Sequence, residues 1–376
     1  MKYKILIILV FVVSAGLFAK ELGFFETCSV YLPEGWAVLG SENDKVTFAD
    51  PSQNAFLQIK RYSGDTYDNP GKIYSSVLSR LNGRGEGDSF NYETRASYFG
   101  NISFSLSGNT YKGFTVCIDG EDADYVILSF SLSGKYSDYH DFILSAMDSF
   151  TLDDAGRCSP GVVSQYYYPV PGPEKSIHYL DINGEEVLYT HDLNETEAAQ
   201  VVVEREARIF SAYVNTRMVN EAWTRYYRIL YRDNYRRLDR ISRILAQHLD
   251  PGFTSLSDYE KSALLLSWIQ KYEYYRTGTL SDVLSPISCL VQEKGDCDSR
   301  VLLYLILLKH YGIDGILMVS SVYSHSIAGV NVEGKGARFL FSGVPYLVAE
   351  TTDDVSIGLI DQSMADPSNW LGIHFP

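Results

Sequence analysis

The chain has 376 residues and a formal net charge of −15, and 45% of its residues are hydrophobic. A chain of this length exceeds what one hydrophobic core usually organises, so we expect two or three domains. The excess of acidic residues disfavours nucleic acid or an anionic membrane surface as a partner, because binding to phosphate groups needs a basic surface.

The first residues, MKYKILIILVFVVSAGLFAKELG, have the pattern of a secretory signal peptide. Two lysines give a basic start, an apolar run covers residues 5–18, and small residues stand at Ala15 and Ala19. The run is shorter than the roughly 20 apolar residues that cross a bilayer. We therefore predict a signal peptide over residues 1–19, cleaved near Ala15 or Ala19. The mature protein is expected to be periplasmic or secreted, without a membrane span.

Residues 21–153 read as short strands separated by turns. The segments KVTFAD, AFLQIKRYSG, NISFSLSG, KGFTVCIDG and DYVILSFSLSG alternate apolar with polar residues, which favours a mostly antiparallel sheet. Two other segments, NPGKIYSSVLSRLNG and YSDYHDFILSAMDSFTL, carry apolar residues at spacings of three and four. Such spacing predicts helices that lie on the sheet, so the expected fold class is α+β.

The opening of this region, CSVYLPEGWAVLGSENDKVTFADPSQNAFLQIKRY, together with the order of strands and helices, resembles the PsbP-like family of small α+β domains. The resemblance covers about 130 residues, and we assign it residues 21–153. It implies a binding or positioning module, and it brings no catalytic residue with it.

Gly, Pro and Ser concentrate in DDAGRCSPGVVSQYYYPVPGPEKS, so we predict a linker at residues 154–175. Residues 176–255 are expected to form a strand pair, with a turn at Asn183–Gly184, and then long helices. Arginines recur every three or four residues from Arg225 to Arg243, which places them on one helix face. We expect that face to be solvated or paired with the protein's own carboxylates, and a polyanion-binding face of Arg and Tyr is the alternative.

The sequence contains five cysteines: Cys28, Cys117, Cys158, Cys289 and Cys297. In an oxidising compartment an odd number leaves at least one thiol unpaired within the chain. A bridge between Cys28 and Cys117 is one hypothesis for the first domain.

The stretch GDCDSRVLLYLILLKHYGID places Cys297 at the start of a helix. Asp296 is a suitable N-cap, and the run that follows is apolar on all sides until Gly312, which predicts a buried helix. The helix N-terminus favours a thiolate at Cys297, whereas Asp296 and Asp298 oppose it. A nearby imidazolium would settle the balance and lower the pKa of the thiol.

A base and an acid follow along the chain. The segment ILMVSSVYSHSIAGVNVEG predicts a strand with His325 at its middle, and ARFLFSGVPYLVAETT predicts a returning strand that ends at Glu350. A cysteine at a helix start, a histidine on the next strand and a carboxylate on the strand after it supply a nucleophile, a base and an orienting acid. Cys297, His325 and Glu350 are therefore the candidate catalytic residues.

At these residues the chain resembles the transglutaminase-like superfamily, over roughly residues 260–355. The matching pieces are LSPISCLVQEKGDCDSRVLLYLILLKHYGI, SHSIAGV and YLVAETT. The resemblance implies a papain-like α+β domain over residues 256–376. It also implies a cysteine enzyme that acts on amide or peptide bonds through a thioester, by hydrolysis or by amine transfer. The substrate would be a peptide or protein amide, with an envelope protein as a further partner and no cofactor.

Two features depart from the family pattern. Many members have Asp in the third place, so Asp353 and Asp354 are alternatives to Glu350, and Ser326 rather than an aromatic residue follows the histidine. A single buried cysteine or strand histidine is also more often structural than catalytic. The alternative function is a catalytically inactive transglutaminase-like module that binds or scaffolds envelope components. We expect no metal site, because no CxxC, HxH or HExxH spacing accompanies these residues.

Overall fold

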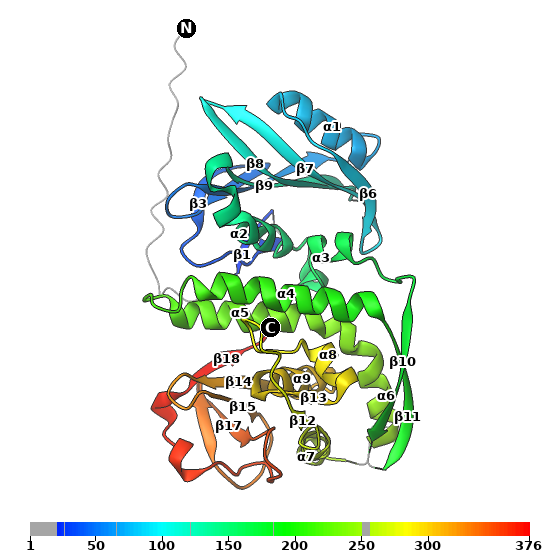
Figure 1. Cartoon of the computed structure of the whole chain (residues 1–376), viewed down its shortest axis with the longest axis vertical. Coiled ribbons are helices and arrows are strands. Elements are labelled where there is room, and N and C mark those ends of the chain that lie inside the picture. Colours follow the sequence, from blue (N-terminus) through cyan, green and yellow to red (C-terminus); the bar gives the residue numbers. More distant parts are fainter. Residues whose placement is uncertain (1–20, 26, 65, 121, 183, 250–255) are drawn as a thin grey trace.

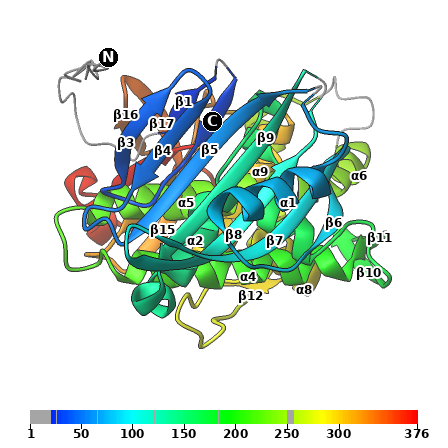
Figure 2. The ribbon, with the colours of Figure 1, turned by 90° about the horizontal axis from the view of Figure 1, so that it is seen from above.

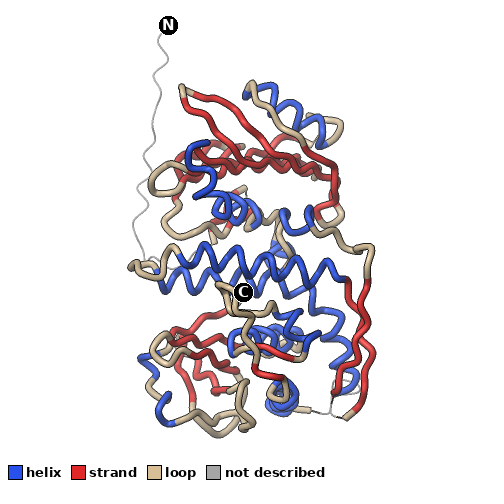
Figure 3. The backbone as a smooth tube through the Cα atoms, in the orientation of Figure 1, coloured by secondary structure: helices blue, strands red, loops and turns tan. Residues whose placement is uncertain are grey.

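The computed structural model describes residues 21–25, 27–64, 66–120, 122–182, 184–249 and 256–376. Two units of strands and helices lie at opposite ends of the molecule, and the long helices α4 (Leu193–Ser211) and α5 (Val219–Tyr235) run between them (Figure 1). Strands gather at the two ends and at one side, with helices in the middle (Figure 3). This arrangement confirms the α+β class. The predicted signal peptide lies outside the described residues.

The first unit is built on an antiparallel sheet. Within the described residues its seven strands lie in the order β3-β4-β5-β9-β8-β7-β6. Their bounds are β3 (Ala37–Glu42), β4 (Lys45–Ala49), β5 (Ala55–Ser63), β6 (Gly87–Tyr92), β7 (Arg95–Leu106), β8 (Asn109–Ile118) and β9 (Ala123–Leu132), and a small hairpin of β1 (Leu22–Phe24) and β2 (Cys28–Val30) precedes them. The predicted strands and the antiparallel pairing are confirmed.

Two helices cover this sheet, one on each face (Figure 2). They are α1 (Pro70–Leu81) and α2 (Tyr136–Asp148), in the two segments that carried helical spacing. The Asn69 side chain caps α1 by accepting from the Lys72 backbone N–H, and the helix ends at Asn82, whose φ is +46°. Its apolar face buries Ile73 and Tyr74 against the sheet.

The segment expected as a linker has structure of its own. It contains η2 (Asp154–Cys158) and α3 (Val162–Tyr167), and Val162 and Val163 pack into the core beneath the sheet. The strand pair follows as β10 (Lys175–Ile182) and β11 (Glu185–Asp192), which run along one side of the molecule (Figure 1). Residue 183 of the predicted turn lies outside the described residues.

The second unit combines helices with another antiparallel sheet. Its described strands lie in the order β16-β17-β15-β14-β18. The bounds are β14 (Gly315–Ser320), β15 (His325–Val330), β16 (Arg338–Phe341), β17 (Val344–Ala349) and β18 (Leu371–His374), with the short strands β12 (Glu273–Tyr274) and β13 (Lys294–Gly295) apart from them. The helices are η3 (Arg236–Leu238), α6 (Asp239–Leu249), α7 (Asp258–Ile269), α8 (Pro286–Gln292), α9 (Cys297–His310), η4 (Gln362–Met364) and η5 (Pro367–Asn369).

The buried helix predicted after Cys297 is α9, which packs on β14 and β15 with α5 on another side. No helix in the described part of the chain is both long and apolar enough to cross a membrane.

Two predicted strands are hairpins instead of single strands. The segment with His325 divides into β14 and β15, so His325 begins a strand instead of lying at its middle, and Ser324 in the turn has φ +50°. The segment that ends at Glu350 divides into β16 and β17 around Ser342 and Gly343, both with positive φ. Alternation of apolar residues continues through both strands of a hairpin, so the pattern did not reveal where the chain reverses.

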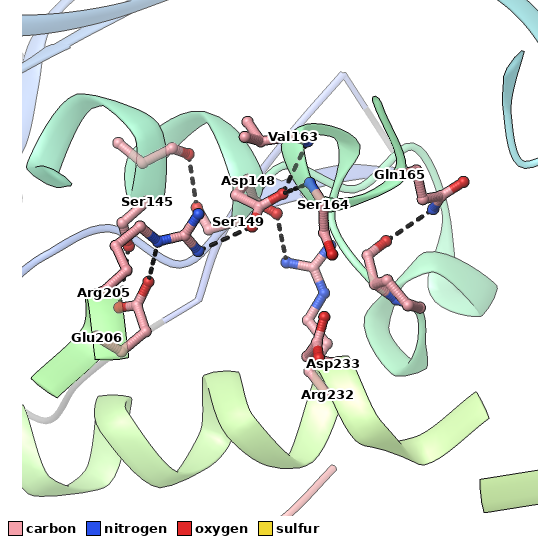
Figure 4. A network of polar contacts seen from close by, with 12 residues as sticks. Ser145, Asp148, Ser149, Val163, Ser164, Gln165, Arg205, Glu206, Arg232 and Asp233 are labelled. Atoms are coloured by element: carbon pink, nitrogen blue, oxygen red, sulfur yellow. Dashed lines mark hydrogen bonds and ion pairs between the residues drawn. The ribbon is translucent and has the colours of Figure 1, made fainter. Parts of the chain in front are cut away.

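A buried polar network joins the first unit to α4 and α5 (Figure 4). Arg205 donates to Asp148 Oδ2 at 2.8 Å and to Glu206 Oε1 at 2.9 Å, and Arg225 donates to Glu206 Oε2 at 2.7 Å. Arg232 donates to the backbone carbonyl oxygens of Asp148, Phe150 and Gly156. The charges are thus paired inside the protein.

The expectation of a solvated face is therefore wrong for two of the arginines, whereas pairing with the protein's own carboxylates is confirmed for Arg225, which donates to Glu206. Arg225 is 2% exposed and Arg232 is 8% exposed, although Arg236 and Arg240 lie at the surface. The reason is that the first unit presents acceptors to this face of α5. A helical spacing of arginines indicates which face they share, but it cannot tell whether water or protein covers that face.

Candidate cysteine site

The thiol of Cys297 lies at the first position of α9. The N-cap is Asp296, whose Oδ1 accepts from the Ser299 backbone N–H at 2.9 Å and from the Ser299 hydroxyl at 2.5 Å. The rest of α9 is apolar and buried almost to its end, so packing fixes the position of its first turn. Cys297 is 8% exposed.

His325 and Glu350 meet at one edge of the second sheet. The strands β15 and β17 pair antiparallel, with Ala328 opposite Ala349, so the start of β15 and the end of β17 lie together. His325 Nε2 and Glu350 Oε2 are 2.7 Å apart. The other carboxylate oxygen of Glu350 accepts from the Thr352 backbone N–H at 2.8 Å and from the Thr352 hydroxyl at 2.6 Å. Glu350 is thus fixed on both sides and holds the imidazole by one nitrogen.

The contact shifts the pKa values of both His325 and Glu350. Burial alone would lower the pKa of His325, but the hydrogen bond and charge of Glu350, assisted by Asp298, raise it above its usual value. Burial likewise opposes ionisation of Glu350, yet His325 and Thr352 hold its pKa below the usual range. The geometry therefore favours a charged imidazolium–carboxylate pair whenever His325 takes up a proton.

The thiol lies in an environment that disfavours its anion. Burial, followed by the charges of Asp298 and Asp296, raises the pKa of Cys297. The backbone N–H groups of Ser326 and Asp298 face the thiol and act in the opposite direction, but they do not outweigh the first effects. The expected lowering of the thiol pKa is thus absent, because two carboxylates and burial dominate over the helix N-terminus.

Ser326 directly follows His325, so the contact of its N–H with the thiol brings Cys297 next to the start of β15. Since Glu350 occupies Nε2, the nitrogen of His325 that is left for chemistry is Nδ1. The described residues give Nδ1 no hydrogen bond.

Asp298 lies between the cysteine and the interior helices. Its Oδ1 accepts from the Tyr227 hydroxyl of α5 at 2.9 Å and from the Ser326 hydroxyl. Burial raises the pKa of Asp298, while these two donors and the charge of His325 oppose the rise. From the sequence, Asp298 was expected only to oppose the thiolate and Ser326 only to follow the histidine, and Tyr227 was not predicted to reach the site. The signal that the sequence offered for these contacts was a polar residue next to each candidate: Asp298 follows Cys297, and Ser326 follows His325.

Aromatic residues border the site. The ring of Trp370 lies 6.4 Å from that of His325, centroid to centroid, and Trp370 is 7% exposed. Near the thiol, Tyr274 is 56% exposed. Burial raises the pKa of Tyr274, and the charge of Cys297 adds to this rise. Trp370 comes 45 residues after His325 in the sequence, and no local pattern linked the two.

The alternative acids are placed differently from Glu350. Asp353 and Asp354 are exposed, whereas Glu350 is 4% exposed and bonded to the imidazole. Asp353 acts on His325 only through its charge.

The remaining cysteines do not contribute to this site. All five are free thiols, so the hypothesis of a Cys28–Cys117 bridge is wrong in this structure. Cys28 of β2 packs in the core beneath the first sheet together with Val116 of β8, whereas the next residue of β8, Cys117, points to the opposite face and packs with α1. Among the described residues, no group of three or more His, Cys, Asp or Glu side chains could hold a metal ion.

The chain matches no protein-family model and no curated protein. Among solved structures it is similar to cyanobacterial PsbP (CyanoP) from Synechocystis sp. PCC 6803, at 10% identity and a TM-score of 0.31, over 38% of this chain and 98% of that one. It is also similar to LpqN of Mycobacterium tuberculosis, which is involved in cell envelope biogenesis, at 18% identity and a TM-score of 0.25, over 33% and 82% of the two chains. A candidate protease of Parabacteroides distasonis ATCC 8503 has 10% identity and a TM-score of 0.22, over 84% and 68%. TM-scores this low do not establish a common fold.

Proposed function

We propose that this protein is a transglutaminase-like cysteine enzyme that acts on an amide or peptide bond, with Cys297 as nucleophile, His325 as base and Glu350 as the acid that orients the imidazole. The observation that carries the proposal is the 2.7 Å contact of His325 Nε2 with Glu350 Oε2, at a sheet edge that also lies beside the thiol. It is the relation of base and orienting acid that nucleophilic catalysis by a thiol requires.

In the proposed reaction, the Cys297 sulfur attacks the carbonyl carbon of the substrate while His325 Nδ1 takes the thiol proton. The tetrahedral intermediate collapses, the C–N bond breaks, and the imidazolium gives its proton to the departing amine. Water or a second amine then attacks the thioester and loses a proton to His325, and the thiol is released with that proton.

The raised thiol pKa fits transfer of the proton during attack better than a thiolate present beforehand. The Cys297 backbone N–H at the start of α9 is our candidate for one donor to the developing oxyanion.

A second function has an observation in its favour. Cys297 is nearly buried and its surroundings hold the thiol in the neutral form, as in a structural cysteine. The alternative is a transglutaminase-like module that has no catalytic activity and binds or scaffolds envelope components.

Labelled casein and a fluorescent alkylamine test the two functions together. The wild-type protein should release label by hydrolysis or incorporate the amine, and Cys297→Ala should lose on the order of 10³-fold or more of either activity. Cys289→Ala is the matched control, because Cys289 is fully buried in the middle of another helix, α8, and should keep the activity. Equal activity of wild type and Cys297→Ala would rule out the nucleophile.

Thiol alkylation tests the site without a substrate. Iodoacetamide labelling of Cys297 should accelerate as the pH rises, and His325→Ala should slow it near neutral pH. Slow labelling that is independent of His325 would favour the scaffold.

We also propose that the chain is exported, with residues 21–153 as a PsbP-like positioning module for the cysteine domain. Mass spectrometry of protein from the native host should find a mature N-terminus near residue 16 or 20. An intact Met1 on most molecules would contradict export with cleavage.

A further inference from the structure

A cavity of about 620 Å³ lies between the first unit and the turn that joins α4 to α5. Its lining residues are distant in the sequence from Cys297, His325 and Glu350. That turn reaches the left edge of the molecule in Figure 1. Trp36 from the first unit, Tyr139 and Phe142 of α2, and Tyr213 and Met218 of the turn contribute to its lining. The volume is in the range of small-molecule sites, and aromatic walls are typical of them.

Glu34 also lines this cavity, and it is only 9% exposed. Its backbone carbonyl accepts from the Tyr213 hydroxyl at 3.0 Å, which fixes the residue in place. Its carboxylate is different, because no donor in the described part of the chain reaches the buried Oε1 atom. A buried acceptor without a donor lowers the stability of a protein, so a donor from outside the chain would be favourable here.

The cation whose charge acts on Glu34 does not provide that donor. Arg225 is close enough for its charge to act on Glu34, but its three nitrogens donate to Tyr31 O, Glu206 Oε2 and Ser145 Oγ. Burial, with a smaller contribution from Glu206 and Glu221, raises the pKa of Glu34 to about 7 in spite of Arg225.

The other carboxylates of the cavity already have partners. Asp50 accepts from the backbone N–H groups of residues 52, 54 and 55 and from the Tyr139 hydroxyl. Asp138 is exposed and pairs with Lys135. The Glu34 carboxylate accepts from its own backbone N–H, and its Oε1 atom has no donor among the described residues, so Glu34 is the acidic group of this cavity with capacity left for a ligand's hydrogen bond.

We propose that the cavity binds an organic ligand with a primary ammonium group, which donates to the Glu34 carboxylate while an apolar portion packs on Trp36, Tyr139 and Phe142. An ammonium group supplies donors and the opposite charge, and aromatic faces attract cations as well as apolar groups. Lys135 and Arg217 also line the cavity, and their positive charges repel cations. Recognition of the ammonium group therefore depends on the buried Glu34 carboxylate. The inference does not depend on the cysteine site.

Isothermal titration of the mature protein at pH 8 tests the proposal with phenethylamine, and 2-phenylethanol is the probe without charge. The amine should bind, and the alcohol should bind at least tenfold more weakly. Glu34→Gln should weaken amine binding at least tenfold, whereas Asp138→Asn, which changes an exposed carboxylate of the lining, should leave it within about twofold.

Two further measurements apply if Glu34→Gln fails to fold. Met218→Trp should remove amine binding by filling the cavity from the turn. In the wild type, affinity for the amine should rise with pH through about 7, where Glu34 ionises while the amine stays charged. Other charges near Glu34 come from Arg225, Glu206 and Glu221, and the lining adds Asp50, Lys135, Asp138 and Arg217.

Three results would each overturn the proposal. The amine could bind no more tightly than the alcohol, its binding could survive Glu34→Gln or Met218→Trp, or the amine could fail to bind at millimolar concentration.

Discussion

Two buried polar clusters differ in whether their hydrogen-bonding groups are all occupied. In the network between α2, α4 and α5, Glu206 accepts from Arg205, Arg225 and Ser145, and each guanidinium is in turn held by carboxylates, a hydroxyl or backbone carbonyls. At the candidate cysteine site, both carboxylate oxygens of Glu350 have partners, but among the described residues His325 uses one nitrogen and the thiol of Cys297 has backbone N–H groups as its hydrogen-bond partners.

A cluster with every group paired has no capacity left for a substrate, and its consequence is the fixed position of the parts that it joins. Among the described residues, His325 Nδ1 and the Cys297 thiol have no hydrogen bond to each other or to another side chain, so both keep capacity for a substrate. Helix α5 takes part in both, because Arg225 lies in the network while Tyr227 donates to Asp298 beside the thiol. The comparison predicts that substitutions in the two clusters separate activity from stability.

The largest effect is expected from Glu350→Gln. The imidazole loses the acceptor that orients it and stabilises its charged form, so turnover should fall by about 10⁴-fold, as judged from loss of the orienting acid in other triads. The fold should persist, because glutamine has the same shape and can still accept from Thr352. Activity assays with circular dichroism check both parts. The controls Asp353→Asn and Asp354→Asn should change little, and the opposite ranking would transfer the role to these aspartates.

The network should respond in the opposite manner. Glu206→Gln leaves the buried Arg225 guanidinium without its carboxylate partner and leaves Arg205 with Asp148 alone, so it should lower the free energy of unfolding by about 3–5 kcal/mol, measured with urea. Glu42→Gln removes an exposed partner of Lys45 and should cost less than about 1 kcal/mol. Activity per folded molecule should remain near that of the wild type. A loss of activity without a loss of stability in Glu206→Gln would erase the distinction between the clusters.

Local patterns in the sequence predicted much of the fold and the residues proposed for the candidate site. The strands of the first sheet, α1, α2 and the buried α9 follow from alternation, helical spacing and caps at Asn69 and Asp296. Hairpin reversals at Ser324 and Ser342 were missed, since the residues on both sides alternate alike.

What remained hidden depends on contacts between distant segments. The burial of Arg225 requires Glu206 of α4, and the raised thiol pKa requires knowledge of how deeply Cys297 lies. Trp370 approaches His325 only because the chain returns as β18 beside β14. No spacing within one segment contains this information.

A smaller effect is expected where α5 reaches the cysteine site. Tyr227→Phe removes a donor to Asp298 and should lower the free energy of unfolding by about 1–3 kcal/mol. With one hydrogen-bond donor fewer, the negative charge of Asp298 acts more strongly on the thiol and raises the pKa of Cys297 further. The pH profile of Cys297 alkylation should therefore move to higher pH.

The matched control is Tyr304→Phe, which removes a buried hydroxyl that donates to the Ser262 carbonyl at 3.0 Å. It should cost a similar stability and leave the alkylation profile in place. An equal displacement of the profile in both variants would show that it reflects a general loosening of the protein rather than Asp298.

The smallest effect concerns the stability that the His325–Glu350 pair itself provides. The pKa of His325 is raised, so its contribution is complete below the unfolded value near 6.5 and is lost as the pH rises through the folded value. The pKa of Glu350 is lowered, so its contribution is present above about 4.5 and is lost as the pH falls through the folded value. The difference in unfolding free energy between wild type and Glu350→Gln should therefore be largest between about pH 4.5 and 6.5 and should shrink toward pH 8.5. Urea unfolding of both proteins at pH 5.5 and 8.5 measures it, and contributions from other titrating groups cancel in the difference. A difference that stays constant or grows toward pH 8.5 would mean that the pair is not ionised in the folded protein, and the proposed role of Glu350 in stabilising the imidazolium would then be lost.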